Sequence, residues 1–112
     1  MEMVYEPPPD FDRATTQRLL DSEGTQDQVS ALHAATFGDP DDEWVLAPLL
    51  NKVTSDDPEV RYAAAAFTAT YIGMGRPVAP ETRPKLVQAK VRFPDLEAVV
   101  DDGLAELSNR GA

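Results

Sequence analysis

The chain of 112 residues contains no cysteine and a single histidine, His33. Without cysteine it can have no disulfide framework, no zinc–thiolate site and no thiol nucleophile. A lone histidine with no cysteine to join it is a poor starting point for a metal site, so we expect His33 to be a packed or surface residue. The lack of cysteine also fits a reducing compartment, and we expect a cytoplasmic location.

Long apolar runs are absent too. No stretch approaches the ~18 apolar residues that a membrane-spanning helix requires. The start, Met1 to Glu6 followed by Pro7-Pro8-Pro9, has neither the basic nor the apolar region of a signal peptide. We therefore expect a soluble protein with a flexible Pro-rich arm over 1–9 and a single domain over 10–112.

Basic residues are scarce, and the net charge is −10. Residues 1–60 hold 14 Asp and Glu but 3 Lys and Arg, and residues 94–112 hold 5 acids and one Arg. Residues 61–93 reverse the balance, with 6 Lys and Arg against one Glu. Nucleic acids and anionic membranes should repel so acidic a chain, so we expect neither as a partner. The basic segment serves either solubility or the steering of a partner.

Recognisable catalytic and ligand-binding motifs are also missing. The acids between 39 and 43 lack the alternating spacing and central glycine of a calcium-binding loop, and they suit helix capping better. Asp101 and Asp102 are neighbours, which point about 100° apart on a helix and so make poor acid–base partners. The glycines at 73 and 75 match no phosphate loop. We expect no enzyme activity, no cofactor and no metal site.

Patterns that predict α-helices dominate the sequence. Apolar residues recur at spacings of three and four, and no useful segment alternates strictly as a half-buried strand does. The expected helices cover about 11–22, 27–37, 42–54, 58 to the glycines at 73 and 75, 83–92 and 95–107. Their short connections predict an all-α stack of about six antiparallel helices. We expect the residues after 107 to fray.

Capping residues mark the expected helix starts. The expected N-caps are Asp10, Asp39, Asp57 and Thr82. The clearest start is Asp57-Pro58-Glu59, which supplies a cap, a proline at the first helical position and a first-turn acid in that order. Pro48 lies inside the third expected helix, where it either belongs to the first turn of a later-starting helix or bends it.

The sequence also repeats itself. Gln28 to Thr36 aligns with Glu59 to Phe67, an offset of 31 residues that places Val29 on Val60. A weaker third copy begins at Pro94, 36 residues after Pro58. Self-similarity at such a period is typical of stacked helical repeats.

The segment 55–66, which reads SDDPEVRYAAAA, resembles the first helix of a HEAT repeat, and 43–54 resembles a second helix. The resemblance is strong over 42–73, moderate over 26–41 and 80–107, and absent before 24. It implies a short armadillo-type α-solenoid in which Asp56 or Asp57 and Arg61 form a ladder between repeats. Ser30 departs from the family pattern at the arginine position, so the ladder is incomplete.

HEAT-like proteins are mostly binding scaffolds, which implies a non-catalytic protein-binding module. Size and charge also suggest, by analogy, small acidic bacterial immunity or inhibitor proteins that occlude a basic partner. The residues expected to contact that partner are Asp39, Asp41, Asp42, Glu43, Asp56, Asp57, Glu59 and Tyr62.

Two other functions are compatible with the sequence. One alternative is an adaptor or structural subunit that buries the apolar ends of its helical stack within a larger assembly. A less favoured alternative is a nucleic-acid binder that uses Arg76, Arg83, Lys85, Lys90 and Arg92. Trp44, Tyr62 and Tyr71 are candidate interface anchors, although core packing is the expected role of Trp44 and a surface position that of Tyr62.

Overall fold

A computed structural model describes residues 12–110 as an all-helical protein. The six α-helices are α1 (Arg13–Leu20), α2 (Thr25–Gly38), α3 (Asp42–Lys52), α4 (Pro58–Gly73), α5 (Thr82–Arg92) and α6 (Glu97–Arg110), with a 3-10 turn, η1 (Pro94–Leu96), before α6. Residues 12–110 include no strand, and none of their helices is long and apolar enough to cross a membrane. The predicted all-α class is confirmed, whereas the expected arm at 1–9 lies outside the described residues.

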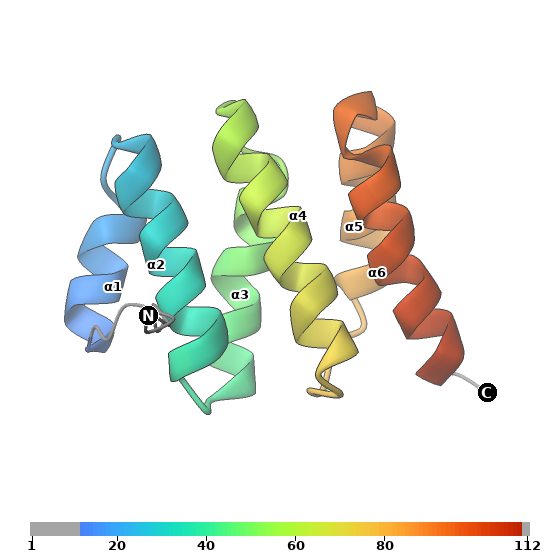
Figure 1. Cartoon of the computed structure of the whole chain (residues 1–112), viewed down its shortest axis with the longest axis horizontal. Coiled ribbons are helices and arrows are strands. Elements are labelled where there is room, and N and C mark those ends of the chain that lie inside the picture. Colours follow the sequence, from blue (N-terminus) through green and yellow to red (C-terminus); the bar gives the residue numbers. More distant parts are fainter. Residues whose placement is uncertain (1–11, 111–112) are drawn as a thin grey trace, which may run out of the picture.

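Successive helices run in opposite directions (Figure 1). Helices α2, α4 and α6 lie side by side at the front of this view, with α3 and α5 behind them and α1 along the outer edge of α2. The turns before α2, α4 and α6 all lie at one end of the molecule, which we call the upper end after Figure 1. The turns α2–α3 and α4–α5 lie at the opposite, lower end.

Aspartates begin three of the helices. Asp12, Asp41 and Asp57 each accept a hydrogen bond from a backbone N–H of the first turn of α1, α3 and α4, respectively. This satisfies donors that have no partner within a helix. Asp57 was predicted as a cap and is confirmed, but α3 begins after Asp41 rather than after the expected Asp39. Helix α1 starts after Asp12, and the expected cap Asp10 lies outside the described residues.

Two further boundaries correct the prediction. Thr82 is the first residue of α5 rather than its cap, and its side chain is buried instead of accepting a hydrogen bond from the helix start. Helix α6 continues to Arg110, past the point where the chain was expected to fray. Pro48 lies in the interior of α3, which the structure assigns as one continuous helix from Asp42 to Lys52.

Helix α4 is the centre of the core, because it packs on α2, α3 and α6. Its alanine run is low in bulk, and Ala64 and Ala65 are fully buried where neighbouring helices approach. Tyr71 and Ile72 extend the same buried face toward the lower end of the helix. Burial of Tyr71 removes it from the candidate interface anchors.

Burial does not favour the 31-residue register. At that offset one buried pair coincides, Ala34 with Ala65, whereas an offset of 32 or of 33 pairs three buried positions of α2 with buried positions of α4. At the 31-residue offset the half-buried Val29 would fall on the fully buried Val60. The 36-residue offset to the third copy does match burial, because Ala64 and Val100 are both buried.

Candidate functional site

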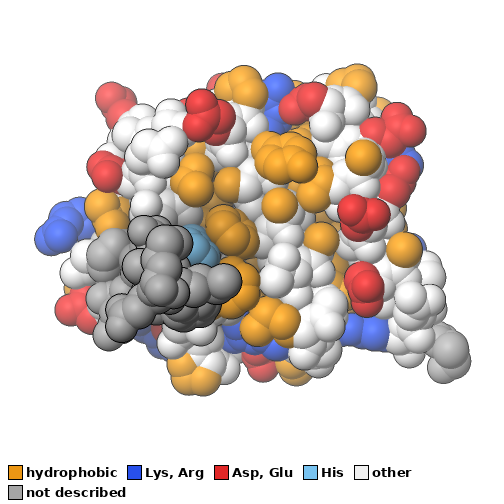
Figure 2. All heavy atoms as spheres, in the orientation of Figure 1, with side chains coloured by type: hydrophobic (Ala, Val, Ile, Leu, Met, Phe, Trp, Pro, Cys, Tyr) orange, Lys and Arg blue, Asp and Glu red, His pale blue; other side chains and the backbone are white. Residues whose placement is uncertain are grey.

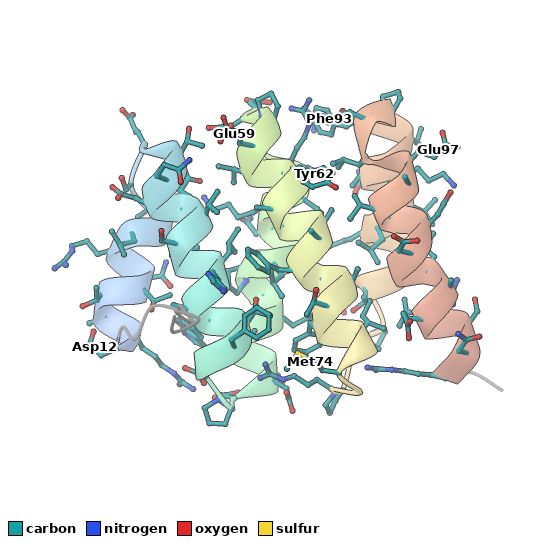
Figure 3. The ribbon with its side chains drawn as sticks, in the orientation of Figure 1. Asp12, Glu59, Tyr62, Met74, Phe93 and Glu97 are labelled. Carbon is teal, nitrogen blue, oxygen red and sulfur yellow. The ribbon has the colours of Figure 1, made fainter. Side chains whose placement is uncertain are left out.

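The acids predicted to form one binding surface lie at the two ends of the molecule. Asp39, Asp41, Asp42 and Glu43 surround the α2–α3 turn at the lower end. At the upper end, Asp56 and Asp57 lie in the α3–α4 turn, and Glu59 and Tyr62 lie in the first turns of α4. In Figure 3, Glu59 and Tyr62 occupy the upper half of α4 and Met74 its lower end. The structure therefore does not bring the eight predicted residues together.

Arginines of the same chain already pair with most acids of the α2–α3 turn, Asp39, Asp41, Asp42 and Glu43, which we call the lower cluster. Arg13 Nε lies 2.8 Å from Asp39 Oδ2, and its Nη2 lies 3.0 Å from Asp41 Oδ2. The guanidinium also lies 5.0 Å above the ring of Trp44, which is half-buried against the core. The hydrogen bond from Arg13 holds the pKa of Asp39 below its usual value. These acids thus fix α1 to the α2–α3 turn.

Arg76 secures the same turn from the other side. Its Nε lies 2.7 Å from Asp42 Oδ1, and its two terminal nitrogens donate to the carbonyls of Thr36 and Asp39, both at 2.8 Å. The last carbonyls of a helix lack partners within the helix, so Arg76 satisfies part of the end of α2. Its guanidinium also stacks on Tyr71, 4.8 Å from the ring centroid. In this cluster only Glu43 is exposed and in no ion pair with residues 12–110.

The acids at the start of α4, Asp56, Asp57 and Glu59, which we call the upper cluster, have different hydrogen-bond partners. Asp57 Oδ1 accepts the backbone N–H groups of Glu59 at 3.0 Å and of Val60 at 3.4 Å, and its other oxygen accepts the hydroxyl of Thr25 at the start of α2. The hydrogen bond from Thr25, followed by those from the backbone, lowers the pKa of the Asp57 carboxyl. Asp57 is therefore a structural residue, whereas Glu59 and Asp56 are exposed.

Arg61 links the α3–α4 turn to the next turn of the upper end. Its side chain pairs with Asp95 of η1 through contacts of 3.2 and 3.3 Å, and it donates to the backbone carbonyl of Asp56 at 3.2 Å. The guanidinium also lies 4.2 Å above the ring of Phe93. The carboxylate partner of Arg61 is thus Asp95 of the next upper turn, and neither Asp56 nor Asp57 pairs with Arg61 through its carboxylate.

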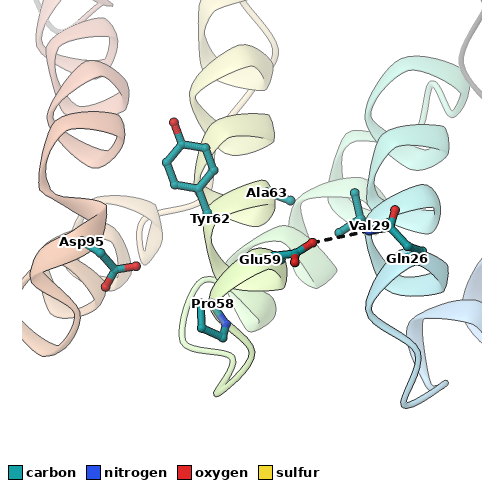
Figure 4. Close-up of a pocket in the computed structure, with 7 residues that line it drawn as sticks. All are labelled: Gln26, Val29, Pro58, Glu59, Tyr62, Ala63 and Asp95. Carbon is teal, nitrogen blue, oxygen red and sulfur yellow. Dashed lines mark hydrogen bonds between the residues drawn. The ribbon is translucent and has the colours of Figure 1, made fainter.

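A shallow groove runs along the upper end of the α2–α4–α6 face (Figure 4). It has a volume of about 420 Å³ and is lined by Gln26, Val29, Pro58, Glu59, Tyr62, Ala63 and Asp95. The apolar part comes from Val29, Pro58, Tyr62 and Ala63. Asp95 lies to one side of these residues, and Glu59 lies between Val29 and Tyr62. Tyr62 is 53% exposed, as its predicted surface position requires.

Carboxylates of the groove differ in how they are held. Asp95 is paired with Arg61, whereas Glu59 contacts only the amide of Gln26, at a long 3.4 Å. No lysine or arginine among residues 12–110 forms an ion pair with Glu59. Glu59 thus presents an uncompensated negative charge beside exposed apolar surface.

Aromatic side chains continue this face toward the lower end. His33 stacks on Phe67 with ring centroids 5.3 Å apart, and the edge of Phe37 meets both rings. Phe37 is 45% exposed, and His33 and Phe67 are half-buried. His33 is therefore a packed residue, as predicted. Figure 2 shows apolar side chains gathered over α2 and α4 and acidic side chains over α6.

Sequence patterns identified two of the seven groove residues, Glu59 and Tyr62. Val29 falls at helical spacing with other residues of α2, a pattern that does not mark it as a groove residue, and it is half-buried. Gln26 and Ala63 carry no chemical signal of their own. Asp95 could have been found from the third repeat copy, whose opening Pro94-Asp95 parallels Pro58-Glu59.

Within residues 12–110 no group of three or more histidine, cysteine, aspartate or glutamate side chains is arranged to hold a metal ion. Comparison of the chain with protein-family models, curated proteins and solved structures finds no match.

Proposed function

We propose that the protein is a non-catalytic binding module that receives a basic, partly apolar segment of another protein in the groove between α2 and α4. The observation that carries the proposal is the pairing of exposed Tyr62 and half-buried Val29 and Ala63 with the uncompensated carboxylate of Glu59. Apolar side chains of a partner would cover the tyrosine ring, and a lysine or arginine would meet Glu59. Tyrosine is among the residues that dominate binding energy at interfaces.

The lower acidic cluster is a weaker candidate for the same role. Asp39, Asp41 and Asp42 already pair with Arg13 or Arg76, so a basic partner would have to displace arginines of this chain. Ion pairs formed in exchange for existing ones add little net affinity. We therefore propose that a basic partner contacts the upper end of the molecule and not the α2–α3 turn.

We also propose that the helices form a short HEAT-like array. Two observations support it: the pairwise succession of antiparallel helices, and the links between successive upper turns from Thr25 to Asp57 and from Arg61 to Asp95. Repeat arrays of this kind present an extended face to partners. On this proposal the α2–α4–α6 face is that surface, and occlusion of a basic partner, as by an immunity or inhibitor protein, is its mode of action.

The proposal is tested by a quantitative pull-down at about 50 and 500 mM salt, with wild type and two variants as bait. Tyr62→Glu removes the aromatic surface from the groove, and Met74→Glu introduces the same acid at a similarly exposed position just after the lower end of α4. We expect capture of a basic protein by wild type and by Met74→Glu, with a loss of at least tenfold for Tyr62→Glu. Higher salt should weaken capture because exposed charges are screened.

A charge-reversal pair completes the test. Glu59→Lys should abolish capture, whereas Glu23→Lys, an exposed acid in the turn between α1 and α2, should leave it unchanged. Equal capture by Tyr62→Glu, Glu59→Lys and wild type would refute a role for the groove. Thermal unfolding of each variant, followed by circular dichroism, excludes misfolding as the cause of a loss.

A further inference from the structure

The outer side of α5 carries an exposed apolar stripe that no residue between 12 and 110 covers. Val87 and Val91 are 43% and 75% exposed, and Pro84 lies one turn before Val87 on the same side. Leu86 and Ala89 occupy the opposite side and are fully buried. Side chains three and four residues apart share a face of a helix, so Pro84, Val87 and Val91 form one continuous stripe, which we call the α5 stripe.

Uncompensated cations border the α5 stripe on both sides. At 100° per residue, Arg83 lies on one edge and Lys85 and Arg92 lie on the other. Arg83 contacts a neutral hydroxyl, Ser108 Oγ, at 3.5 Å, and Arg92 stacks on Phe93. None of the three pairs with a carboxylate among the described residues, in contrast to Arg76 and Lys90, which pair with Asp42 and Asp101.

From this arrangement we infer that the outer side of α5 is a second docking surface, which receives an acidic amphipathic segment of a partner protein. Aliphatic residues of that segment would cover Val87 and Val91, and its carboxylates would meet Arg83 and Arg92. The inference goes beyond the proposed function, because the surface lies on another helix and selects the opposite charge. It accounts for the basic segment 61–93, whose uncompensated cations gather where apolar surface is exposed.

The apolar centre distinguishes this partner from other anionic ones. Phosphate backbones are bound by lysines and arginines in a continuous patch, whereas here two valines separate the cations. A bilayer surface is bound by large aromatic or leucine side chains that insert into it, and the stripe has neither. Sedimentation experiments distinguish a second copy, whose Glu59 is also uncompensated, from a separate partner protein.

The test uses a fluorescein-labelled synthetic helical peptide of about 18 residues, with leucine on one face and glutamate on both flanks. Anisotropy should show saturable binding to wild type at about 50 mM salt and at least tenfold weaker binding to Val87→Ser/Val91→Ser. Arg83→Glu/Arg92→Glu should lose a similar factor. Met74→Ser and Arg18→Glu, matched changes at exposed positions elsewhere, should bind as wild type does, and so should Tyr62→Glu, which separates this surface from the groove.

Three results would overturn the inference. One is unchanged peptide binding by the valine variant, which would mean that charge alone attracts the peptide. Another is tighter binding of duplex DNA or phosphatidylserine vesicles than of the peptide. The third is self-association of wild type in sedimentation experiments that the valine variant abolishes, which would assign the surface to a second copy.

Discussion

Many aspartates of this acidic protein stabilise its fold by capping helices or by pairing with arginines. Asp12, Asp41 and Asp57 each cap a helix, and Asp39, Asp42 and Asp95 each hold an arginine from a distant part of the chain. An acid that caps or pairs is fixed by its own fold and is less available to a partner. The carboxylates that remain, Glu59 above all, carry the proposed function.

Replacement of Asp57 by alanine should destabilise the protein, because α4 loses its cap and Thr25 loses its partner. We expect the melting temperature to fall by roughly 4 °C or more, as loss of an N-cap does in a domain of this size. Asp56→Ala is the matched control, since Asp56 is exposed and only its backbone carbonyl is used. Equal melting temperatures for the two variants would contradict the capping role.

Acid should remove the stabilisation that these aspartates provide. The pKa of Asp39 is lowered by Arg13 and that of Asp57 by Thr25, so each group is easier to ionise in the folded protein than in the unfolded chain. Their contribution is complete above the unfolded pKa of about 4 and is lost as the pH falls through the lower folded value. Wild type should therefore exceed Asp39→Asn/Asp57→Asn in urea midpoint at pH 6, and the difference should shrink below about pH 4. A difference that stays constant down to pH 3 would contradict this linkage.

Among the helices, the α4–α6 contact shows how small residues set the spacing of elements. Gly103 of α6 faces Ala69 of α4 across the pair. A Cβ atom added to Gly103 would lie 3.6 Å from the Cα and Cβ atoms of Ala69, which is ordinary van der Waals contact. The helices are thus close enough to exclude a large side chain, yet they leave space for a methyl group.

Gly103→Ala should raise the free energy of unfolding by about 0.5–1 kcal/mol, because alanine loses less conformational freedom than glycine in a helix interior. Gly103→Leu should instead lower it by about 1–3 kcal/mol, because its side chain forces α6 away from α4. Gly75 offers the contrast, since its φ of +81° disfavours any side chain. Gly75→Ala should cost about 1 kcal/mol. Chemical denaturation measures all three, and destabilisation by Gly103→Ala would show that the contact is tighter than described.

Helix existence could be predicted from the sequence, but several boundaries could not. Apolar spacing and the Asp57-Pro58-Glu59 start are local signals, and they predicted α4 correctly. Asp39 and Asp41 are equally good caps by residue type, and Arg13 pairs with both of them, so neither residue type nor pairing marks Asp41 as the cap. Thr82 is a good cap by type as well, but tertiary packing buries it.

At the scale of the whole molecule, contacts at the lower end join parts of the chain that lie far apart in the sequence. Arg76, in the loop after α4, binds the α2–α3 turn, and Arg110 donates to the carbonyl of Ile72 at the end of α4. These contacts span 34 to 40 residues and have no signature in a single sequence. That is why the acids of the α2–α3 turn were predicted to be available for a partner.

Removal of Arg76 tests this view of the lower end. Arg76→Met should lower the free energy of unfolding by about 1–3 kcal/mol, because Asp42 and two helix-terminal carbonyls lose their donor. Arg18→Met is the control, an exposed arginine on α1. The same loss for both variants would mean that the ion pair at the turn contributes nothing specific.

The antiparallel prediction already contained part of the site geometry. In such a stack the turns on either side of α3 lie at opposite ends, so residues 39–43 and 56–62 could not form one patch. The groove itself depends on Val29 being only half-buried and on Asp95 lying beside the first turns of α4, where it pairs with Arg61. Both follow from how far α2, α4 and η1 are apart, which the pattern of one chain does not specify.

Amide chemical shifts measured on the isotope-labelled protein, titrated with the basic segment of a captured partner, test the proposed binding site most directly. We predict shifts concentrated at Gln26, Val29, Glu59, Tyr62 and Ala63, and their loss in Tyr62→Glu but not in Met74→Glu. Shifts confined to the α2–α3 turn, or to α5, would contradict binding in the groove.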